Sequence, residues 1–312
     1  MYPADSNNEP AGDNAPRGLQ DRAGSFRLLT LNLGLLGVGM SGLWRLPIDS
    51  ELKRRLAAAP DLLSAIDADV IALQEVYAPA DRQFLIRAMA ARYPFSAGSP
   101  KALSLVGNGL MVLSRFPIRH SEFVLCQGAP RWTRLVWKQG LLGVDLDLPV
   151  VGRTRLINVH LAASVPFGHS ESMASEANRD REIAQLLSVA SSGDPAAILA
   201  GDFNNSPEIH SNHYRRIIAA GYVDAFVAAR EAAGATDGFT WDAANPLNAR
   251  GRFRNSPSQR IDHVFVSDAR APSLMPVSAQ IVLRESIIPT PSGRRIPLSD
   301  HYGMLVTLAA SG

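Results

Sequence analysis

Residues 297–308 read Pro-Leu-Ser-Asp-His-Tyr-Gly-Met-Leu-Val-Thr-Leu, which places Asp300 and His301 directly before an alternating apolar run near the C-terminus. Such alternation is typical of a half-buried β-strand. A carboxylate and an imidazole at the edge of a strand indicate catalysis more than packing. The meaning of this pair therefore depends on the partners that the rest of the chain supplies.

Five further apolar segments each end in, or contain, a residue suited to metal or phosphate chemistry. These residues are Asn32, Glu75, His160, the pair Asp202 and Asn204, and Asp262. One polar strand end is ordinary in a soluble protein, whereas six in one chain predict an active site.

Composition limits the classes of protein that fit. The 312 residues can form one large domain or two small ones, and an apolar content of 46% is ordinary for a globular protein. The net charge of +2 is too small to indicate nucleic-acid binding by itself. The single cysteine, Cys126, excludes an intrachain disulfide and is interpreted as a small buried hydrophobic residue.

Residues 1–25 are rich in Pro, Asn, Asp and Gly and contain no apolar stretch. We expect a disordered leader there and not a secretory signal, which would need an apolar core. No run in the chain reaches the ~18 uncharged apolar residues that a membrane span requires. The expected location is therefore the cytoplasm or the periphery of a membrane surface.

From residue 26 to residue 310 the chain alternates strand-like and helix-like segments without a long linker, which predicts one domain. The expected helices are residues 51–66, 81–91 and 176–191, the last with Arg179 and Arg181 turned outward. The expected strands are residues 26–31, 70–73, 109–114, 140–148, 155–160, 197–200, 261–266 and 304–308. Many strands with a few interspersed helices predict an α+β sandwich of two packed sheets covered by helices.

The residue types favour magnesium over zinc. Mg²⁺ takes oxygen ligands and needs only one or two carboxylates, whereas a zinc cage would need several His or Cys. We assign Glu75 as the metal ligand, with Asn32 assisting. A Glu at the end of a buried strand is expected to have a charged partner or a metal ion, since an unpaired buried charge is heavily disfavoured.

Hydrolysis of a phosphoester also needs a base, a water in line with the leaving group and donors to the phosphoryl oxygens. We assign His301 as the base because imidazole titrates near neutral pH, with Asp262 or Asp300 steadying the ring. Asp202 and Asn204, two apart on an extended segment, should point the same way and orient water and phosphate. His160 would donate to the phosphoryl group or to the leaving oxygen.

These motifs together resemble the exonuclease–endonuclease–phosphatase superfamily. They occur in that family's order over nearly the whole chain after the leader. The resemblance implies a four-layer αββα sandwich of two mixed β-sheets flanked by helices. It also implies metal-dependent hydrolysis of phosphoesters by the domain at residues 26–310, with Mg²⁺ as cofactor and Mn²⁺ or another divalent ion able to substitute.

Within that superfamily the chain is similar to neutral magnesium-dependent sphingomyelinases. Residues 107–118 resemble their glycine-led strand, and Lys138 lies in a segment similar to their Lys-Gly-Leu-Leu, with Gln139 inserted. Trp241, in Phe-Thr-Trp-Asp, matches a stretch of bacterial sphingomyelinases. The resemblance implies that Lys138 and Trp241 contact a choline phospholipid, and that sphingomyelin is cleaved to ceramide and phosphocholine. Thr-Trp-Asp also occurs in tyrosyl-DNA phosphodiesterases.

The segment at residues 33–47 is apolar and glycine-rich and includes Trp44. Because it follows Asn32, we expect it at the mouth of the site, where Trp44 would insert into lipid headgroups. Packing inward remains the alternative for this loop. We expect a monomer without an obligate protein partner.

Two other functions stay open. A nuclease or tyrosyl-DNA phosphodiesterase would use the arginines near Phe253 and Trp132, and it should bind DNA with a steep salt dependence. A non-catalytic lipid- or protein-binding module would keep the fold without turnover. The complete set of site residues argues against this third reading.

Overall fold

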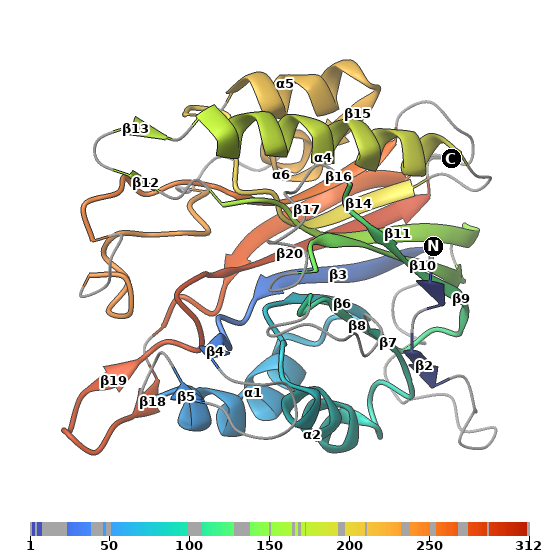
Figure 1. Ribbon diagram of the computed structural model, residues 1–312. Helices are drawn as coiled ribbons and strands as arrows, with labels where there is room; N and C mark the ends of the chain where they lie inside the picture. The colour runs from blue at the N-terminus through green and yellow to red at the C-terminus, as the bar shows by residue number, and fades with distance from the viewer. Residues whose placement is uncertain are drawn as a thin grey trace.

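Two seven-stranded sheets stack face to face in the computed structural model, with helices on both outer sides (Figure 1). The structure describes residues 2–3, 5–7, 24–38, 46–47, 51–98, 108–127, 138–149, 151–163, 166–167, 170–171, 173–192, 197–209, 211–231, 238–249, 254–267, 274–285 and 287–310. The expected α+β four-layer sandwich of two mixed sheets is confirmed.

The first sheet has the order β1-β9-β10-β11-β14-β16-β15. Its strands are β1 (Tyr2–Pro3), β9 (Ile118–Leu125), β10 (Gly140–Leu148), β11 (Gly152–His160), β14 (Ala197–Asp202), β16 (Asp262–Ser267) and β15 (Tyr222–Asp224). Strands β11 and β14 run parallel, and the other neighbours run antiparallel. This sheet is covered on its outer side by α4 (Met173–Ser191) and α5 (Ser211–Ala219), with α6 (Ala225–Glu231) beside them (Figure 1).

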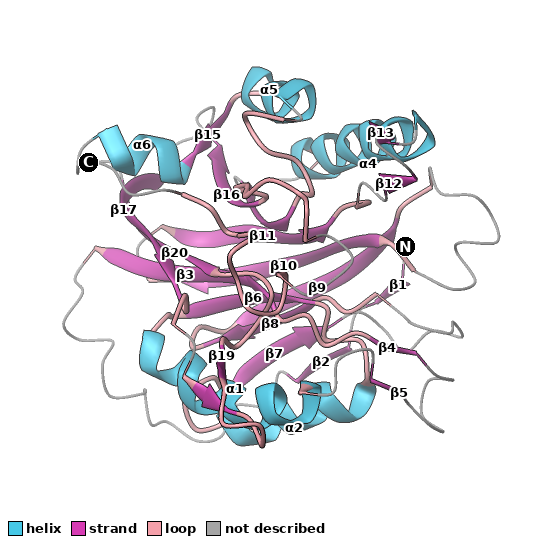
Figure 2. Cartoon of the chain, turned by 90° about the vertical axis from the view of Figure 1, so that its left-hand side faces the viewer, coloured by secondary structure: helices cyan, strands magenta, loops and turns pink. Residues whose placement is uncertain are grey.

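The second sheet has the order β17-β20-β3-β6-β8-β7-β2. Its strands are β17 (Leu274–Val282), β20 (Gly303–Ala310), β3 (Ser25–Asn32), β6 (Val70–Gln74), β8 (Met111–Ser114), β7 (Phe95–Gly98) and β2 (Asp5–Asn7). Only β3 and β6 run parallel among its described pairs. Helices α1 (Leu52–Ile66) and α2 (Pro79–Met89) cover its outer side, as the two views in Figures 1 and 2 show.

Three apolar clusters fill the spaces between these layers. The cluster between the sheets includes Leu28, Val144 and Val264, because alternate strand residues face inward. A second cluster packs the other face of β3, β6 and β8 on α1 and α2, and a third packs the first sheet on α4 and α5. The central strands are therefore buried on both faces, which explains their continuous apolar runs.

Three pairs of two-residue strands complete the described elements. They are β4 (Gly37–Val38) with β5 (Leu46–Pro47), β12 (Pro166–Phe167) with β13 (Ser170–Glu171), and β18 (Ile288–Pro289) with β19 (Arg295–Ile296). No described helix is long and apolar enough to span a bilayer.

The helices and strands expected from the sequence can be compared with those of the structure. Every expected strand and helix is present, and α1 runs unbroken through Pro60. Within the expected leader, β1 pairs with β9 and β2 with β7. The outward orientation expected for Arg179 is wrong, because the side chain is fully buried between α4, α5 and the loop after β11. Helical periodicity places Arg on the polar face but does not reveal a partner on another element.

Candidate active site

The pairing of the strands brings the six polar strand ends to one edge of the sandwich. Parallel β3 and β6 end together at Asn32 and Gln74, which puts Glu75 beside Asn32. Parallel β11 and β14 align His160 with Asp202. Antiparallel β16 begins opposite the end of β14, so Asp262 lies across from Asp202.

The two sheets are joined below this edge by a buried pair of amides. Gln74 Nε2 donates to Asn158 Oδ1 at 2.8 Å, and Asn158 Nδ2 donates to the Leu73 and Met111 carbonyls at 2.9 and 3.0 Å. Gln74 precedes Glu75, and Asn158 lies two residues before His160. The link therefore sets the spacing of Glu75 and His160 across the two sheets.

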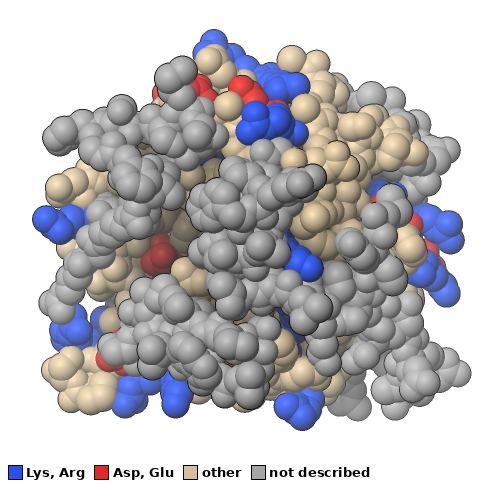
Figure 3. All heavy atoms as spheres, viewed as in Figure 1, with Lys and Arg blue, Asp and Glu red and all other residues tan. Residues whose placement is uncertain are grey.

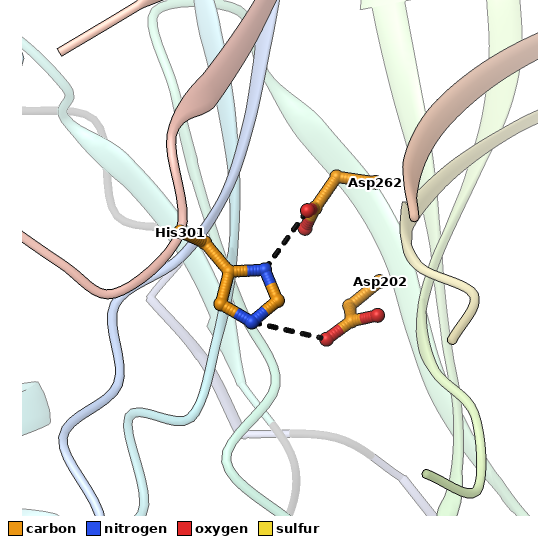
Figure 4. Close-up of side chains that lie close together, drawn as sticks. All are labelled: Asp202, Asp262 and His301. Carbon is orange, nitrogen blue, oxygen red and sulfur yellow. Dashed lines mark hydrogen bonds and ion pairs between the residues drawn. The ribbon is translucent and has the colours of Figure 1, made fainter. Parts of the chain in front are cut away.

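Asp202, Asp262 and His301 form the innermost group of the site (Figure 4). They are 1%, 0% and 7% exposed. His301 Nδ1 lies 2.9 Å from Asp262 Oδ2, and its Nε2 lies 3.9 Å from Asp202 Oδ2. An imidazole that donates Nδ1–H to Asp262 keeps Nε2 as the nitrogen that can exchange a proton with a reacting group.

Electrostatics in this group act in opposite directions. Burial would lower the pKa of His301, but the carboxylates of Asp262 and Asp202 raise that pKa well above its usual value. Burial raises the pKa of Asp262, and the His301 charge opposes this shift. Asp262 and His301 therefore stabilise each other's charged forms through their opposite charges and one hydrogen bond, in a site that is buried from water.

Asn32 lies between two carboxylates. Its Nδ2 donates to Asp202 Oδ2 at 3.0 Å and to Glu75 Oε1 at 3.2 Å, and its Oδ1 accepts from the Gly34 amide at 3.0 Å. The amide thus holds Glu75 near Asp202. Its expected role as a metal ligand stays a prediction.

Glu75 occupies an unusual backbone position. Its φ of 59° is in the left-handed region, which is sparsely populated for residues other than glycine and is often found at functional sites. Burial raises the pKa of the Glu75 carboxyl, His160 lowers it, and the Asp300 carboxylate raises it again. A cation bound at Glu75 would relieve the repulsion between these two carboxylates.

Asn204 differs from its expected geometry. Strand β14 ends at Asp202, and Asn204 has a φ of 50°, so the segment is a turn and not an extended pair. Its backbone amide donates to Asp202 Oδ1 at 2.9 Å, while its Nδ2 donates to the Leu161 carbonyl at 2.9 Å. The turn is an Asx arrangement, in which the Asp202 side chain binds the backbone two residues on. The expectation that the two side chains point the same way along an extended strand is therefore wrong.

His160 and Asp300 border the innermost group. His160 Nε2 lies 3.5 Å from Asp202 Oδ2, and its side chain is partly exposed. Asp300 Oδ1 lies 3.1 Å from Ser299 Oγ, and a Cβ added to Gly34 would overlap that same Asp300 oxygen. The glycine therefore allows the loop after Asn32 to approach Asp300 closely.

Small polar residues that the sequence analysis did not single out hold the His301 turn. Ser299 Oγ donates to the Asn32 carbonyl at 2.6 Å and accepts from the His301 amide at 3.2 Å. Thr240 Oγ1 accepts from the amide of Asp262 at 3.0 Å. Asn248 Nδ2 donates to the Asp300 carbonyl at 2.8 Å. The signal available in the sequence was their position next to predicted site residues or to the Thr-Trp-Asp stretch.

Two of the three predicted substrate contacts, Lys138 and Trp241, fall within the described residues. Trp241 is buried, and its backbone pairs with the backbones of Gln259 and His301, so this residue lies beside the His301 turn. The Lys138 carbonyl accepts from Asn108 Nδ2 at 2.6 Å, and Lys138 is partly exposed. Trp44 lies outside the described residues, as do the arginines near Phe253 and Trp132 apart from Arg254. The substrate roles of Lys138, Trp241 and Trp44 stay predictions.

The donor set fits a hard divalent cation. Within the described ranges one group of three potential metal-binding residues occurs, Asp202, Asp262 and His301, with ligand atoms within 4.8 Å of one another. Asp262 Oδ1 is buried without a hydrogen-bond partner. The carboxylate oxygens of Asp202 and Asp262, and those of Glu75 and Asp300 beside them, suit a hard divalent cation. Figure 3 shows an acidic side chain recessed in a hollow on the face of the molecule viewed there.

Comparisons with known proteins place this geometry in context. A family model described as the endonuclease/exonuclease/phosphatase family matches residues 29–301. A putative neutral sphingomyelinase of Drosophila melanogaster is 27% identical over 293 residues, which are 90% of this chain and 61% of that relative. The chain thus spans about three fifths of that relative's length.

Two solved structures are similar in fold. Sphingomyelinase C from Streptomyces griseocarneus has a TM-score of 0.68 and 23% identity, covering 92% of this chain and 99% of that one. TDP2 of D. rerio, solved with a single-strand DNA product, has a TM-score of 0.64 and 19% identity, covering 92% and 99%. At these identities the likeness concerns the fold and leaves the substrate open.

Proposed function

Because the chain belongs to the endonuclease/exonuclease/phosphatase family, we propose that it is a divalent-metal-dependent phosphodiester hydrolase that cleaves sphingomyelin to ceramide and phosphocholine. The observation that carries the hydrolase assignment is the buried Asp262–His301 pair, whose free nitrogen faces Asp202. The similarity to a protein named a putative neutral sphingomyelinase supports the choice of substrate.

Each side chain has a role in the proposed reaction. In the form that has lost its Nε2 proton, His301 takes a proton from water as the water oxygen attacks phosphorus, and Asp262 stabilises the imidazolium that results. The bond from phosphorus to the ceramide oxygen then breaks. His160, at the edge of the site, donates a hydrogen bond to the phosphoryl group or a proton to the departing oxygen.

The remaining residues orient the reactants. Asp202 accepts hydrogen bonds from the Asn32 side chain and from the Asn204 amide, and its Oδ2 lies 3.9 Å from His301 Nε2, so it keeps these three groups close together. Glu75 would hold the metal, with Asn32 and Asp300 beside it; Mg²⁺ is our choice, and Mn²⁺ could replace it. A bound divalent cation supplies positive charge that stabilises the phosphoryl oxygens as negative charge develops on them.

The edge of the molecule that carries the site also offers a surface for lipid. The hairpin formed by β18 and β19 projects at the side toward which β3 runs (Figure 1) and stands in front in the rotated view (Figure 2). Arg294 and Arg295 are exposed on it, and Ile287 beside it is 39% exposed. Each arginine close to an anionic lipid leaflet adds about 1 kcal/mol to the free energy of binding to that membrane surface. We propose that the phospholipid substrate is reached at a membrane surface, by a protein that acts as a monomer.

DNA is the second candidate substrate, because the fold is shared with a TDP2 solved with a DNA product. The described part of the site does not discriminate between a lipid phosphodiester and a nucleic-acid one, since both present the same phosphoryl oxygens. The arginine clusters that would favour DNA lie mostly outside the described residues.

The test is release of phosphocholine from sphingomyelin vesicles with and without Mg²⁺, run beside a labelled DNA duplex and a phosphotyrosyl oligonucleotide. We expect chelator-sensitive release of phosphocholine, and a loss of at least ~1,000-fold in Glu75→Gln and His301→Asn. His120→Asn, on the exposed face of β9, is the matched control and should keep wild-type activity. DNA turnover with inactive vesicles would move the substrate to nucleic acid, and near-normal activity of either site variant would overturn the assignment.

A further inference from the structure

The two residues that follow His160 are held more tightly than a strand end requires. The Leu161 amide donates to the Asp202 carbonyl at 2.9 Å, and the Leu161 carbonyl accepts from Asn204 Nδ2 at 2.9 Å. These contacts tie the exit of β11 to the turn that contains Asp202. The next peptide group, at Ala162, is bound by side chains of helix α4, in the layer that covers the first sheet.

Two charged side chains of α4 grip both polar groups of Ala162. The Ala162 amide donates to Glu182 Oε2 at 2.8 Å, and Arg179 Nη1 donates to the Ala162 carbonyl at 2.9 Å. Arg179 is 0% exposed and Glu182 is 1% exposed. One residue thus has its N–H and its C=O fixed by oppositely charged groups one helical turn apart.

Both charged groups are themselves held in place. Arg179 Nε donates to His213 Nδ1 at 3.3 Å, and His213 Nε2 lies 3.2 Å from Asp180 Oδ1. Asn178 Nδ2 donates to Glu182 Oε1 at 3.3 Å. The grip on Ala162 is therefore anchored to α4 and α5 together, and neither side chain is free to follow a movement of the loop.

From this geometry we propose that Arg179 and Glu182 are positioning residues for His160. They clamp the Ala162 peptide so that the imidazole stays beside Asp202 and ready to donate to the substrate. The proposal rests on the proposed function for its kinetic consequence but not for its structural one. Neither residue touches the reacting atoms, so both act through His160.

Energetics argue against a purely stabilising role for these charges. Burying a guanidinium and a carboxylate costs several kcal/mol per ion, and apolar side chains of similar volume are often as stabilising or better. A well-packed apolar pair, however, could not fix the direction of a peptide group. The peptide that the pair holds, at Ala162, is two residues from His160, so its direction affects where the imidazole lies.

Charge links the clamp to the imidazole as well. The His160 charge lowers the pKa of Glu182, which burial raises. This coupling supports the geometric argument and requires that the two groups be close.

The kinetic test compares removal of the clamp with its conservative replacement. Glu182→Leu and Arg179→Met should lower kcat by ~10- to 100-fold, the size of effect seen when a positioning contact is lost. KM for sphingomyelin and the Mg²⁺ concentration for half-maximal activity should stay unchanged, since Glu75 lies elsewhere. Glu182→Gln, which keeps an oxygen for the Ala162 amide, should retain most of kcat. Glu176→Gln, exposed on the first turn of the same helix, is the matched control.

A second readout does not depend on turnover. The ¹⁵N-labelled imidazole of His160 gives nuclear magnetic resonance signals that His160→Asn identifies by their disappearance. We expect these signals to shift or broaden in Glu182→Leu and Arg179→Met, and to stay in place in Glu182→Gln and Glu176→Gln.

The outcomes separate the two proposals. If the wild type hydrolyses no phosphodiester, the proposed function fails, and the imidazole signals still decide the clamp. Unchanged His160 signals in folded Glu182→Leu and Arg179→Met would overturn the clamp, whatever the activity. Equal kcat in wild type and both variants, measured well below the melting temperature, would overturn it too.

Discussion

Two buried arginines, Arg55 and Arg179, support the site from opposite layers of the sandwich. Arg55 belongs to α1 under the second sheet, and Arg179 belongs to α4 over the first (Figure 1). Arg55 Nη1 donates to the Leu33 and Leu298 carbonyls at 2.8 and 3.1 Å, and its Nη2 donates to the Gly34 carbonyl at 2.7 Å. Both guanidinium groups thus bind backbone carbonyls next to site residues.

The two supports differ in what they join. Arg55 connects the loop after Asn32 with the segment before Ser299, which are far apart in the sequence and carry Asn32, Asp300 and His301. Arg179 acts with a carboxylate on one peptide beside a single site residue. A support that joins two segments should matter for the assembly of the metal-binding side, whereas a support on one peptide should matter for one catalytic group.

The largest difference should appear when each arginine is replaced by methionine. Arg55→Met leaves three carbonyls without their donor, and we expect a loss of ~3 kcal/mol in the free energy of unfolding. We also expect kcat/KM to fall by more than ~100-fold. The Mg²⁺ concentration that gives half-maximal activity should rise, because the metal-binding side of the site is less well held. Denaturant titration and activity as a function of Mg²⁺ concentration measure these effects.

Arg179→Met provides the comparison for that measurement. It should lower kcat without shifting the Mg²⁺ curve. If both variants shift the Mg²⁺ curve equally, the distinction between the two supports is wrong.

The Arg55 side can be examined without touching the arginine. Gly34→Ala would place a Cβ against Asp300 Oδ1 at a backbone φ of 57°, so both sterics and backbone strain oppose it. We expect a ~10- to 100-fold loss of activity and weaker metal binding, measured by calorimetry with Mn²⁺. Gly152→Ala, at the start of β11 with a φ of 74° and open space around it, controls for the strain alone. Equal losses in the two variants would contradict a specific role for the approach of Gly34 to Asp300.

The Arg179 side should make stability depend on pH through its carboxylate. Burial raises the pKa of Glu182 from 4.5 to about 7 in the folded protein. The folded state therefore binds a proton that the unfolded state has lost between these values, and stability falls as pH rises through this window. The decrease is at most about 3 kcal/mol and is complete above the folded pKa.

Glu182→Gln should remove this part of the pH dependence, because glutamine does not titrate. Thermal or urea unfolding at pH 5 and pH 8 measures it, with Glu176→Gln as control. An unchanged difference between the two pH values in Glu182→Gln would assign the dependence to other groups.

The smallest effect is expected where the α4 support ends. Asp180 is paired with His213 Nε2 at 3.2 Å, but its side chain is 54% exposed. Asp180→Asn keeps an oxygen acceptor and should change stability by less than ~1 kcal/mol and kcat by less than about twofold. A large loss of activity in this variant would mean that the clamp also depends on the exposed contact between Asp180 of α4 and His213 of α5.

Much of the site could be predicted from neighbouring residues in the sequence. Glu75, His160 and Asp202 each end a short apolar run, and such runs become buried strands whose ends must satisfy a polar group. His301 was recognised in the same way, from the strand that begins two residues later. These signals are local, so one sequence suffices to read them.

Other features depend on contacts between distant segments. Arg179 was expected on the outer face because periodicity describes one helix at a time, and its partner Ala162 comes from a different element. Asn204 was expected on an extended segment, although the Asp202 side chain closes a turn there. Arg55 carries no local pattern that distinguishes it from a surface arginine. Ser299 and Thr240 lie next to predicted site residues, but this position does not reveal which groups they bind.

The layered α+β class, the order of the strand-end residues and the oxygen-rich character of the site could all be inferred from the order of the amino acids. Each of these follows from apolar periodicity and from the chemistry of single side chains. The packing of the folded chain was needed to reveal which polar groups share a buried space, namely Asp202 with Asp262 and His301, and Ala162 with Arg179 and Glu182. The reason is physical: hydrogen bonds and charge pairs act over about 3 Å in space, and strand register and helix packing place residues at that distance regardless of their separation along the chain.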